Sequence, residues 1–184
     1  MSVAKPQTAH DLYISSAFNP SSLSIYHLGI YFEGDTLLLG ISNVQHEILL
    51  LRQYKNRDGL YPQKFLEAVW QQDDYMRKRF AQVLLLVEAD KWLPIPAEYV
   101  PDGNEGAYLS VYYEIGESGL AHYRLRTAGI RGVGAAISYA IEGDVAEFIS
   151  ARLSQATLLH AATRYVEMTR ELSLKPLSQR PFTG

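Results

Sequence analysis

Four consecutive residues, Glu33-Gly34-Asp35-Thr36, have the types that could hold a phosphate group beside a metal ion. Backbone N–H groups around a glycine can bind phosphate oxygens, while an acid can lie near the metal and a threonine near an oxygen. The same residues suit the bend of a β-hairpin, because Gly-Asp is a common pair in two-residue turns. We prefer the hairpin, and keep nucleotide binding through Gly34, Asp35 and Thr36 as the alternative.

The histidines and a glycine-rich stretch have simpler interpretations than catalysis. His27, His122 and His160 are too far apart in the sequence to form a metal-binding motif, so we predict a structural role for each. His160 stands just before a predicted helix, where its imidazole could bond to the turn. The stretch "GIRGVG", residues 129–134, leads into a strand, whereas a dinucleotide-binding loop follows a strand and opens a helix.

Charged and aromatic residues elsewhere point to structure or to contacts with other proteins. We predict that Asp73-Asp74 caps a helix, and that Arg77-Lys78-Arg79 is a solvated surface. No Gly-x-Ser-x-Gly motif is present. The chain has 13 tyrosines, which suit ordinary packing at the edge of the core or a protein interface. The tyrosines and arginines that raise this question are Tyr108, Tyr112, Tyr113, Tyr123, Arg124 and Arg126.

Composition narrows the class of protein. The 184 residues are 47% hydrophobic, which is enough for a real core, and the net charge is −3 with scattered basic residues. A strongly basic surface for nucleic acid or an anionic membrane is therefore not expected. The chain has no cysteine, which excludes disulfides and thiol chemistry. No signal-peptide pattern or apolar stretch of membrane-spanning length is visible, so we predict a cytoplasmic protein without a membrane partner.

Apolar patterning predicts strands first and then alternating helices and strands. Residues 23–32, 36–42 and 46–54 form three strands with short links, which predicts an antiparallel meander. Pro62 suits the start of a helix, and a second helical stretch continues to Phe80. The segments expected after it are a strand at 81–89, an edge segment from Lys91, a helix from Asn104 to Ile115, strands at 121–127 and 133–141, a helix from Gly143, a strand at 156–160 and a helix at 161–172.

This order predicts an α/β fold with a mixed sheet and helices on its faces. It is the layout of the ribonuclease H-like fold, and so of one lobe of an actin-like ATPase. We expect a loose lead-in at 1–20, the lobe at 21–172 and an irregular tail at 173–184. One mixed sheet should bury Ile30, Leu39, Leu50, Leu85, Val87, Ile137 and Tyr139.

The first strand lacks the carboxylate that a nuclease of this fold needs. Such an enzyme brings acidic residues together around two metal ions, one of them from within the first strand. No acidic residue occurs between Leu23 and Phe32. We therefore assign no catalytic residue and no metal ligand, and expect the chain not to be an enzyme.

Several strings give the chain a family resemblance. "LSIYHLGIYFEGDTLLLGI" is similar to the first hairpin of the uncharacterised domain-of-unknown-function family 3822, and "YLSVYYEI", "ISYAIEGDVAEFI" and "ATLLHAATRYVEM" resemble the same family. The resemblance covers most of residues 20–172 and implies an actin-like, two-lobed fold with no assigned activity. Members of the family continue into a second lobe. This sequence stops about where that lobe should begin, so we expect a single-lobe variant or a fragment.

The resemblance also bears on whether the turn at residues 33–36 binds phosphate. The phosphate motif of actin-like ATPases has the pattern Asp-x-Gly-x-x-Thr, whereas here Glu33 replaces the aspartate and Gly34 comes one residue early. A nucleotide site would also need a second glycine-rich turn from the other lobe. The resemblance therefore implies a non-catalytic binding or scaffold protein with no cofactor, and the alternative is an actin-like protein that binds ATP with magnesium.

The end of the chain leads to a prediction about partners. Leu174, Leu177 and Phe182 follow the last predicted helix with little local structure to cover them. Exposed apolar surface of this kind marks interfaces. We therefore predict that the chain self-associates or binds a protein partner.

Overall fold

The computed structural model describes residues 9–96, 99, 105–114, 120–127 and 135–163. The chain divides into two compact units. The first contains residues 1–88 and 142–158, and the second contains residues 89–141 and 159–184. Among the described residues, every helix is too short or too polar to cross a bilayer.

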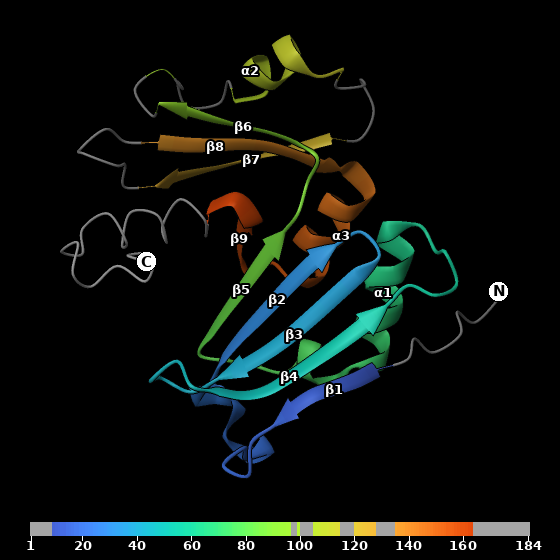
Figure 1. The fold of residues 1–184 in the computed structure, drawn as a ribbon, viewed down its shortest axis with the longest axis vertical. Helices are drawn as coiled ribbons and strands as arrows, with labels where there is room; N and C mark the ends of the chain where they lie inside the picture. The colour runs from blue at the N-terminus through green and yellow to red at the C-terminus, as the bar shows by residue number, and fades with distance from the viewer. Residues whose placement is uncertain (1–8, 97–98, 100–104, 115–119, 128–134, 164–184) are drawn as a thin grey trace, which may run out of the picture. The chain divides into compact units, whose positions relative to one another are not determined.

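A six-stranded mixed sheet organises the first unit (Figure 1). Its order is β1-β4-β3-β2-β5-β9. β2 pairs antiparallel with β3, β3 pairs antiparallel with β4, and β2 pairs parallel with β5. The predicted meander is thus confirmed. The strands are β1 (Ala9–Ile14), β2 (His27–Glu33), β3 (Thr36–Ser42), β4 (Ile48–Lys55), β5 (Gln82–Val87) and β9 (Thr157–His160).

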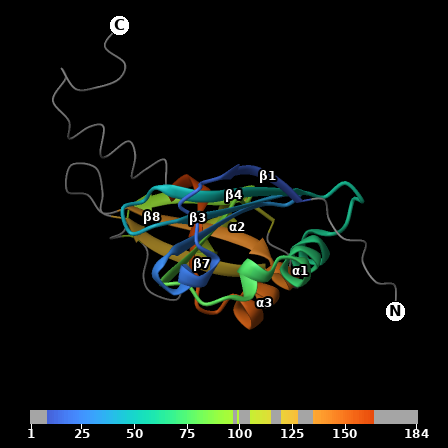
Figure 2. The same cartoon turned by 90° about the horizontal axis from the view of Figure 1, so that it is seen from below.

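Two helices cover one face of this sheet. α1 (Pro62–Gln72) begins at the predicted proline, and it lies beside α3 (Gly143–Arg152) on the same face (Figure 2). Alternate residues of β2 and β3 are buried, as a strand with one covered face requires. The ring of Phe32 lies 6.4 Å from that of Phe65 on α1, so the buried side chains face the helices. Each fully buried side chain of this size contributes about 1.5–3 kcal/mol.

The N-terminal region differs from the prediction. Residues 9–14, expected to be part of a loose lead-in, form β1 and pair antiparallel with β4. All six residues of β1 are exposed, so the strand has no buried side to produce an apolar alternation in the sequence. The first predicted strand also began too early, because Pro20–Ile25 forms a 3-10 helix that Asn19 caps through the N–H of Ser21.

A three-stranded sheet in the order β6-β8-β7 belongs to the second unit. β6 (Lys91–Pro96) is an edge strand, as predicted, and pairs antiparallel with β8 (Ala135–Glu142). β7 spans Leu120–Thr127, and α2 spans Glu105–Tyr112. Ile137 and Tyr139 are buried as expected, but they lie in this sheet, so the prediction of one sheet was wrong. An apolar run indicates that a strand is buried and carries no information about which sheet contains it.

Two of the predicted helical segments are shorter or only partly described. The stretch expected to be helical up to Phe80 forms only a 3-10 helix, η2 (Asp74–Arg77), with Lys78 as its extended C-cap. The last predicted helix is described only at residues 161–163, which are helical. The predicted ends of α2 and the tail lie outside the described residues: Asn104, Ile115, Leu174, Leu177 and Phe182.

Candidate functional site

The turn between β2 and β3 is a two-residue hairpin loop. Glu33 pairs with Thr36 across the strands, which leaves Gly34 and Asp35 in the loop. Gly34 has a φ of 53°, a left-handed conformation that glycine adopts without strain. The hydroxyl of Thr36 donates to the carboxylate of Asp35 at 2.9 Å, and the carbonyl of Asp35 accepts the N–H of Asn56 at 2.8 Å. The side chains expected to contact a nucleotide therefore already bond to each other.

Two carboxylates stand beside this turn, at the C-terminal ends of the parallel strands β2 and β5. Glu33 ends β2, and Glu88 follows β5 directly. The hydroxyl of Tyr31 lies 3.2 Å from Glu33 Oε2 and also bonds to Glu88 Oε2. Burial, and next the bond to Glu88, raises the pKa of the Tyr31 phenol. We call Glu33 and Glu88 the acid pair.

The acid pair makes the surroundings of the turn negative. Glu33, Asp35 and Glu88 all have exposed side chains, and none of them forms an ion pair with a described residue. A phosphate would meet three negative charges here unless a cation came with it. Among the described residues, no group of three or more His, Asp or Glu side chains could hold a metal ion. Sequence reasoning missed Glu88, because it lies 57 residues from Tyr31.

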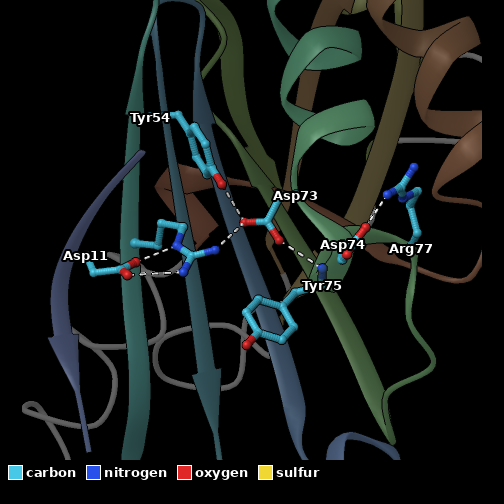
Figure 3. Close-up of polar contacts among 7 residues, drawn as sticks. Asp11, Tyr54, Asp73, Asp74, Tyr75 and Arg77 are labelled. Atoms are coloured by element: carbon cyan, nitrogen blue, oxygen red, sulfur yellow. Dashed lines mark hydrogen bonds and ion pairs between the residues drawn. The ribbon is translucent and has the colours of Figure 1, made fainter. Parts of the chain in front are cut away.

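A second carboxylate cluster is buried between β4 and the end of α1 (Figure 3). Asp73, only 2% exposed, accepts the hydroxyl of Tyr54 at 2.6 Å and a guanidinium N–H of Arg52 at 3.1 Å. Its other oxygen accepts the backbone N–H of Tyr75 at 2.8 Å and so caps η2. The predicted capping role is thus confirmed for Asp73. We call Asp11, Arg52, Tyr54 and Asp73 the buried network.

The electrostatics of the buried network indicate a structural role. Arg52 also pairs with Asp11 on β1 and lies 5.6 Å from the ring centroid of Tyr75. The hydrogen bond from Arg52 lowers the pKa of Asp11. Burial, and next the bond to Asp73, raises the pKa of Tyr54. Because the buried carboxylate of Asp73 is ion-paired and hydrogen-bonded on both oxygens, the network needs no ligand to remain stable.

The histidines are placed by different contacts. Nδ1 of His160 accepts the N–H of Ala162 at 3.0 Å, which confirms the predicted bond to the turn. Its Nε2 lies 3.0 Å from the carbonyl of Ala89, to which it donates in this tautomer. His27 lies with its ring 5.8 Å from that of His46. The side chain of His122 and residues 129–134 lie outside the described part of the structure.

The tyrosines of α2, and Tyr113 directly after it, divide between packing and exposure. Tyr108 packs against Ile95 of β6, and its hydroxyl bonds to the carbonyl of Tyr99. Tyr113 donates to the carbonyl of Trp92 at 3.2 Å. Tyr112 is exposed. Packing at the edge of the core is thus confirmed for Tyr108 and Tyr113, and a protein interface stays a prediction. The side chains of Tyr123, Arg124 and Arg126 are outside the described set.

Strand β1 forms an exposed apolar edge of the six-stranded sheet. Leu12, Tyr13 and Ile14 are 54%, 50% and 54% exposed. The pairing register shifts between Asp11 and Tyr13, so Leu12 is the extra residue of a β-bulge. The N–H of Ser15 bonds to the carbonyl of Leu49 on β4. In an antiparallel pair, successive residues alternate between facing the partner strand and facing away from it. The backbone N–H and C=O of Ile14 therefore point away from β4, toward the open edge of the sheet. Half-exposed apolar side chains along an edge strand are typical of an interaction site.

Comparison with protein-family models identifies the family of this chain. The model of the family "Protein of unknown function (DUF3822)" matches residues 15–180. The chain belongs to this family. The resemblance predicted from the sequence is thus confirmed, and it extends from before β2 to beyond the described residues. No curated protein matches the chain.

A solved structure confirms the fold class. A Bacteroides thetaiotaomicron protein "with actin-like ATPase fold and unknown function" is similar, with a TM-score of 0.75 and 14% identity over 84% of this chain. This chain spans 59% of that protein. The cytoplasmic domain of EpsL, an inner membrane component of the type II secretion system of Vibrio cholerae, has a TM-score of 0.41 and 14% identity, covering 73% of this chain and 57% of that one. The likeness to the Bacteroides thetaiotaomicron protein shows that the chain has an actin-like α/β fold with a mixed sheet.

Proposed function

We propose that this chain is a non-catalytic binding or scaffold protein of the cytoplasm that engages a protein partner through β1. The exposed apolar edge carries the proposal. Leu12, Tyr13 and Ile14 present half of their surface to solvent, although the core behind them is well packed. Association would remove this apolar surface from water at about 25 cal/mol per Å².

A second copy of the chain is the partner that we propose. An antiparallel pair of identical β1 edges would place the same residues on both sides of a two-fold axis. The bulge at Leu12 interrupts the ladder, so side chains would contribute more to the interface than backbone bonds. A strand of another protein could occupy the same edge, and would then leave this chain alone as a monomer.

The experiment is to measure mass in solution by light scattering. The wild-type chain is expected to give twice the monomer mass, and the double variant Leu12→Lys with Ile14→Lys the monomer mass. Ile25→Lys is the control, because Ile25 is 60% exposed on the 3-10 helix and outside the edge. It should keep the dimer. A monomeric wild type at high concentration, or a dimer that survives in the double variant, would contradict self-association through β1.

A second candidate function is nucleotide binding at the turn. It is supported by the actin-like fold and by the open space around Gly34, where an added Cβ would meet no atom within 4 Å. The acid pair and Asp35 oppose it unless magnesium accompanies the phosphates. ATP with magnesium at about 100 times its dissociation constant should stabilise a binding protein by about 2.7 kcal/mol. A thermal shift that disappears in Asp35→Asn would support this candidate, and no shift at millimolar ATP would count against it.

A further inference from the structure

Two arginines lie over one tryptophan where α1 and α3 end. The Arg152 Cζ atom lies 5.0 Å from the centre of the Trp70 ring, and the Arg77 Cζ atom lies 5.7 Å from it. Trp70 is near the end of α1 and also packs edge-on against Phe148 of α3. The indole N–H is buried and has no acceptor among the described residues, so the ring acts through its faces. We call Trp70, Arg77 and Arg152 the Trp70 cluster.

The Trp70 cluster carries an excess of positive charge. Both of its arginines are exposed, as are Lys78 and Arg79, which follow Arg77 in the chain. Asp74 forms an ion pair with Arg77 and is itself 75% exposed. Arg152 has no carboxylate partner among the described residues, and a cation–π contact at an exposed site contributes only about 0.5–1 kcal/mol. This surface is therefore basic on a chain whose net charge is −3.

We infer that the Trp70 cluster is a docking surface for an acidic protein segment. The guanidinium groups of both arginines lie over the ring, and because both side chains are exposed their N–H groups remain in reach of solvent. Such groups bind carboxylates through two parallel hydrogen bonds, a geometry that lysine cannot reproduce. Ordering the guanidinium groups in advance also lowers the entropy lost on binding.

The size of the basic surface favours a short acidic segment over nucleic acid. A nucleic-acid footprint is a basic stripe that follows many phosphates. Here two guanidinium groups, those of Arg77 and Arg152, lie over Trp70, and the exposed Lys78 and Arg79 follow Arg77 in the chain. Because Asp74 already pairs with Arg77, three glutamates or aspartates would neutralise the remaining positive charge of these four basic residues. This surface is distinct from the β1 edge, so the inference does not depend on self-association.

The test uses the full chain and a fluorescein-labelled peptide that contains six glutamates, with fluorescence anisotropy as the readout. Arg152→Gln should weaken peptide binding by roughly tenfold, because it removes one charged hydrogen-bonding group. Arg152→Lys should keep only part of the affinity, because lysine keeps the positive charge but cannot form the two parallel hydrogen bonds of a guanidinium group. Arg57→Gln is the matched control, since Arg57 is exposed and lies in the loop after β4. It should leave binding unchanged.

Several outcomes would overturn the inference. The glutamate peptide could fail to bind at high micromolar concentration, or could bind no better than the same peptide with six glutamines. Arg57→Gln could weaken binding as much as Arg152→Gln, which would indicate only general charge attraction. A single-stranded oligonucleotide that binds more tightly than the peptide, and that loses affinity in Arg152→Gln, would assign the surface to nucleic acid instead. Equal melting temperatures of the variants would show that each one folds.

Discussion

The buried network and the acid pair use the same chemical unit, a tyrosine hydroxyl on a carboxylate, in opposite settings. Tyr54 donates to Asp73 inside the protein, where Arg52 supplies the opposite charge. Tyr31 bonds to Glu88 at the surface, beside a second carboxylate, with no ion pair to a described cation. The first arrangement is complete and stabilises the fold. The second leaves negative charge in solvent, where it can meet a ligand at little cost to the fold.

The largest expected effect comes from removing the cation of the buried network. Arg52→Met should destabilise the protein by about 3 kcal/mol, because it leaves the carboxylate of Asp73 buried without its ion-pair partner. Urea unfolding measures this change. Lys64→Met is the control, because Lys64 forms an exposed pair with Glu67 that should contribute well under about 1 kcal/mol.

A second substitution tests whether Arg52→Met loses stability because the carboxylate of Asp73 is left without its ion-pair partner. Adding Asp73→Asn to Arg52→Met removes the uncompensated charge and keeps an acceptor for the η2 cap. The double variant should recover part of the lost stability. If it is less stable than Arg52→Met alone, the main contribution of Arg52 is packing and not charge.

The two tyrosines provide a matched pair for the next prediction. Tyr54→Phe should cost about 1.5–3 kcal/mol, since it removes a buried hydrogen bond to a charged group. Tyr31→Phe should cost less than about 0.5 kcal/mol, because water can replace the lost hydroxyl at the surface. Urea unfolding of both variants compares them directly. Equal losses would show that Tyr31 also has a structural role and would weaken the distinction between the regions.

The stabilities of Tyr54→Phe and Tyr31→Phe should also depend differently on pH in the alkaline range. The pKa of Tyr54 is raised above its ordinary value of 10.0 in the folded state. Above pH 10 the unfolded chain loses this proton while the folded protein retains it, so the free energy of unfolding falls as the pH rises. Tyr54→Phe should reduce this fall, and Tyr31→Phe should reduce it less because solvent screens its surroundings. Unfolding curves between pH 8 and about pH 11 give the comparison.

A small effect is also expected at the exposed end of the buried network. Asp11→Asn should cost about 0.2–1 kcal/mol at pH 7, because the carboxylate is 37% exposed. The pKa of Asp11 is lowered from 3.8, so its contribution is present above that pH and is lost as the pH falls below it. Wild type and Asp11→Asn should therefore converge in stability at strongly acidic pH. A constant difference down to low pH would show that the charge of Asp11 is not involved.

Sequence patterns predicted what depends on local periodicity. β3 occupies the predicted residues 36–42, and α1 begins at Pro62 as expected. β1 was missed because none of its side chains is buried. The turn at Gly34 was predictable from two residues, whereas the meeting of Tyr31 with Glu88 depends on the parallel pairing of β2 with β5. The ion pair between Arg52 and Asp73 also depends on the folded structure, because it forms only where the start of η2 lies against β4.

The prolines of β6 bear on how many copies an assembly could contain. Pro94 and Pro96 stand on an edge strand, where proline is tolerated because its nitrogen has no hydrogen to donate. This edge is poorly suited to receive another strand. If β1 pairs with β1 of a second copy, both copies have used the same surface, and the symmetry closes at two. Growth into a filament would need a second, different edge, and β6 is chemically unsuited to supply it.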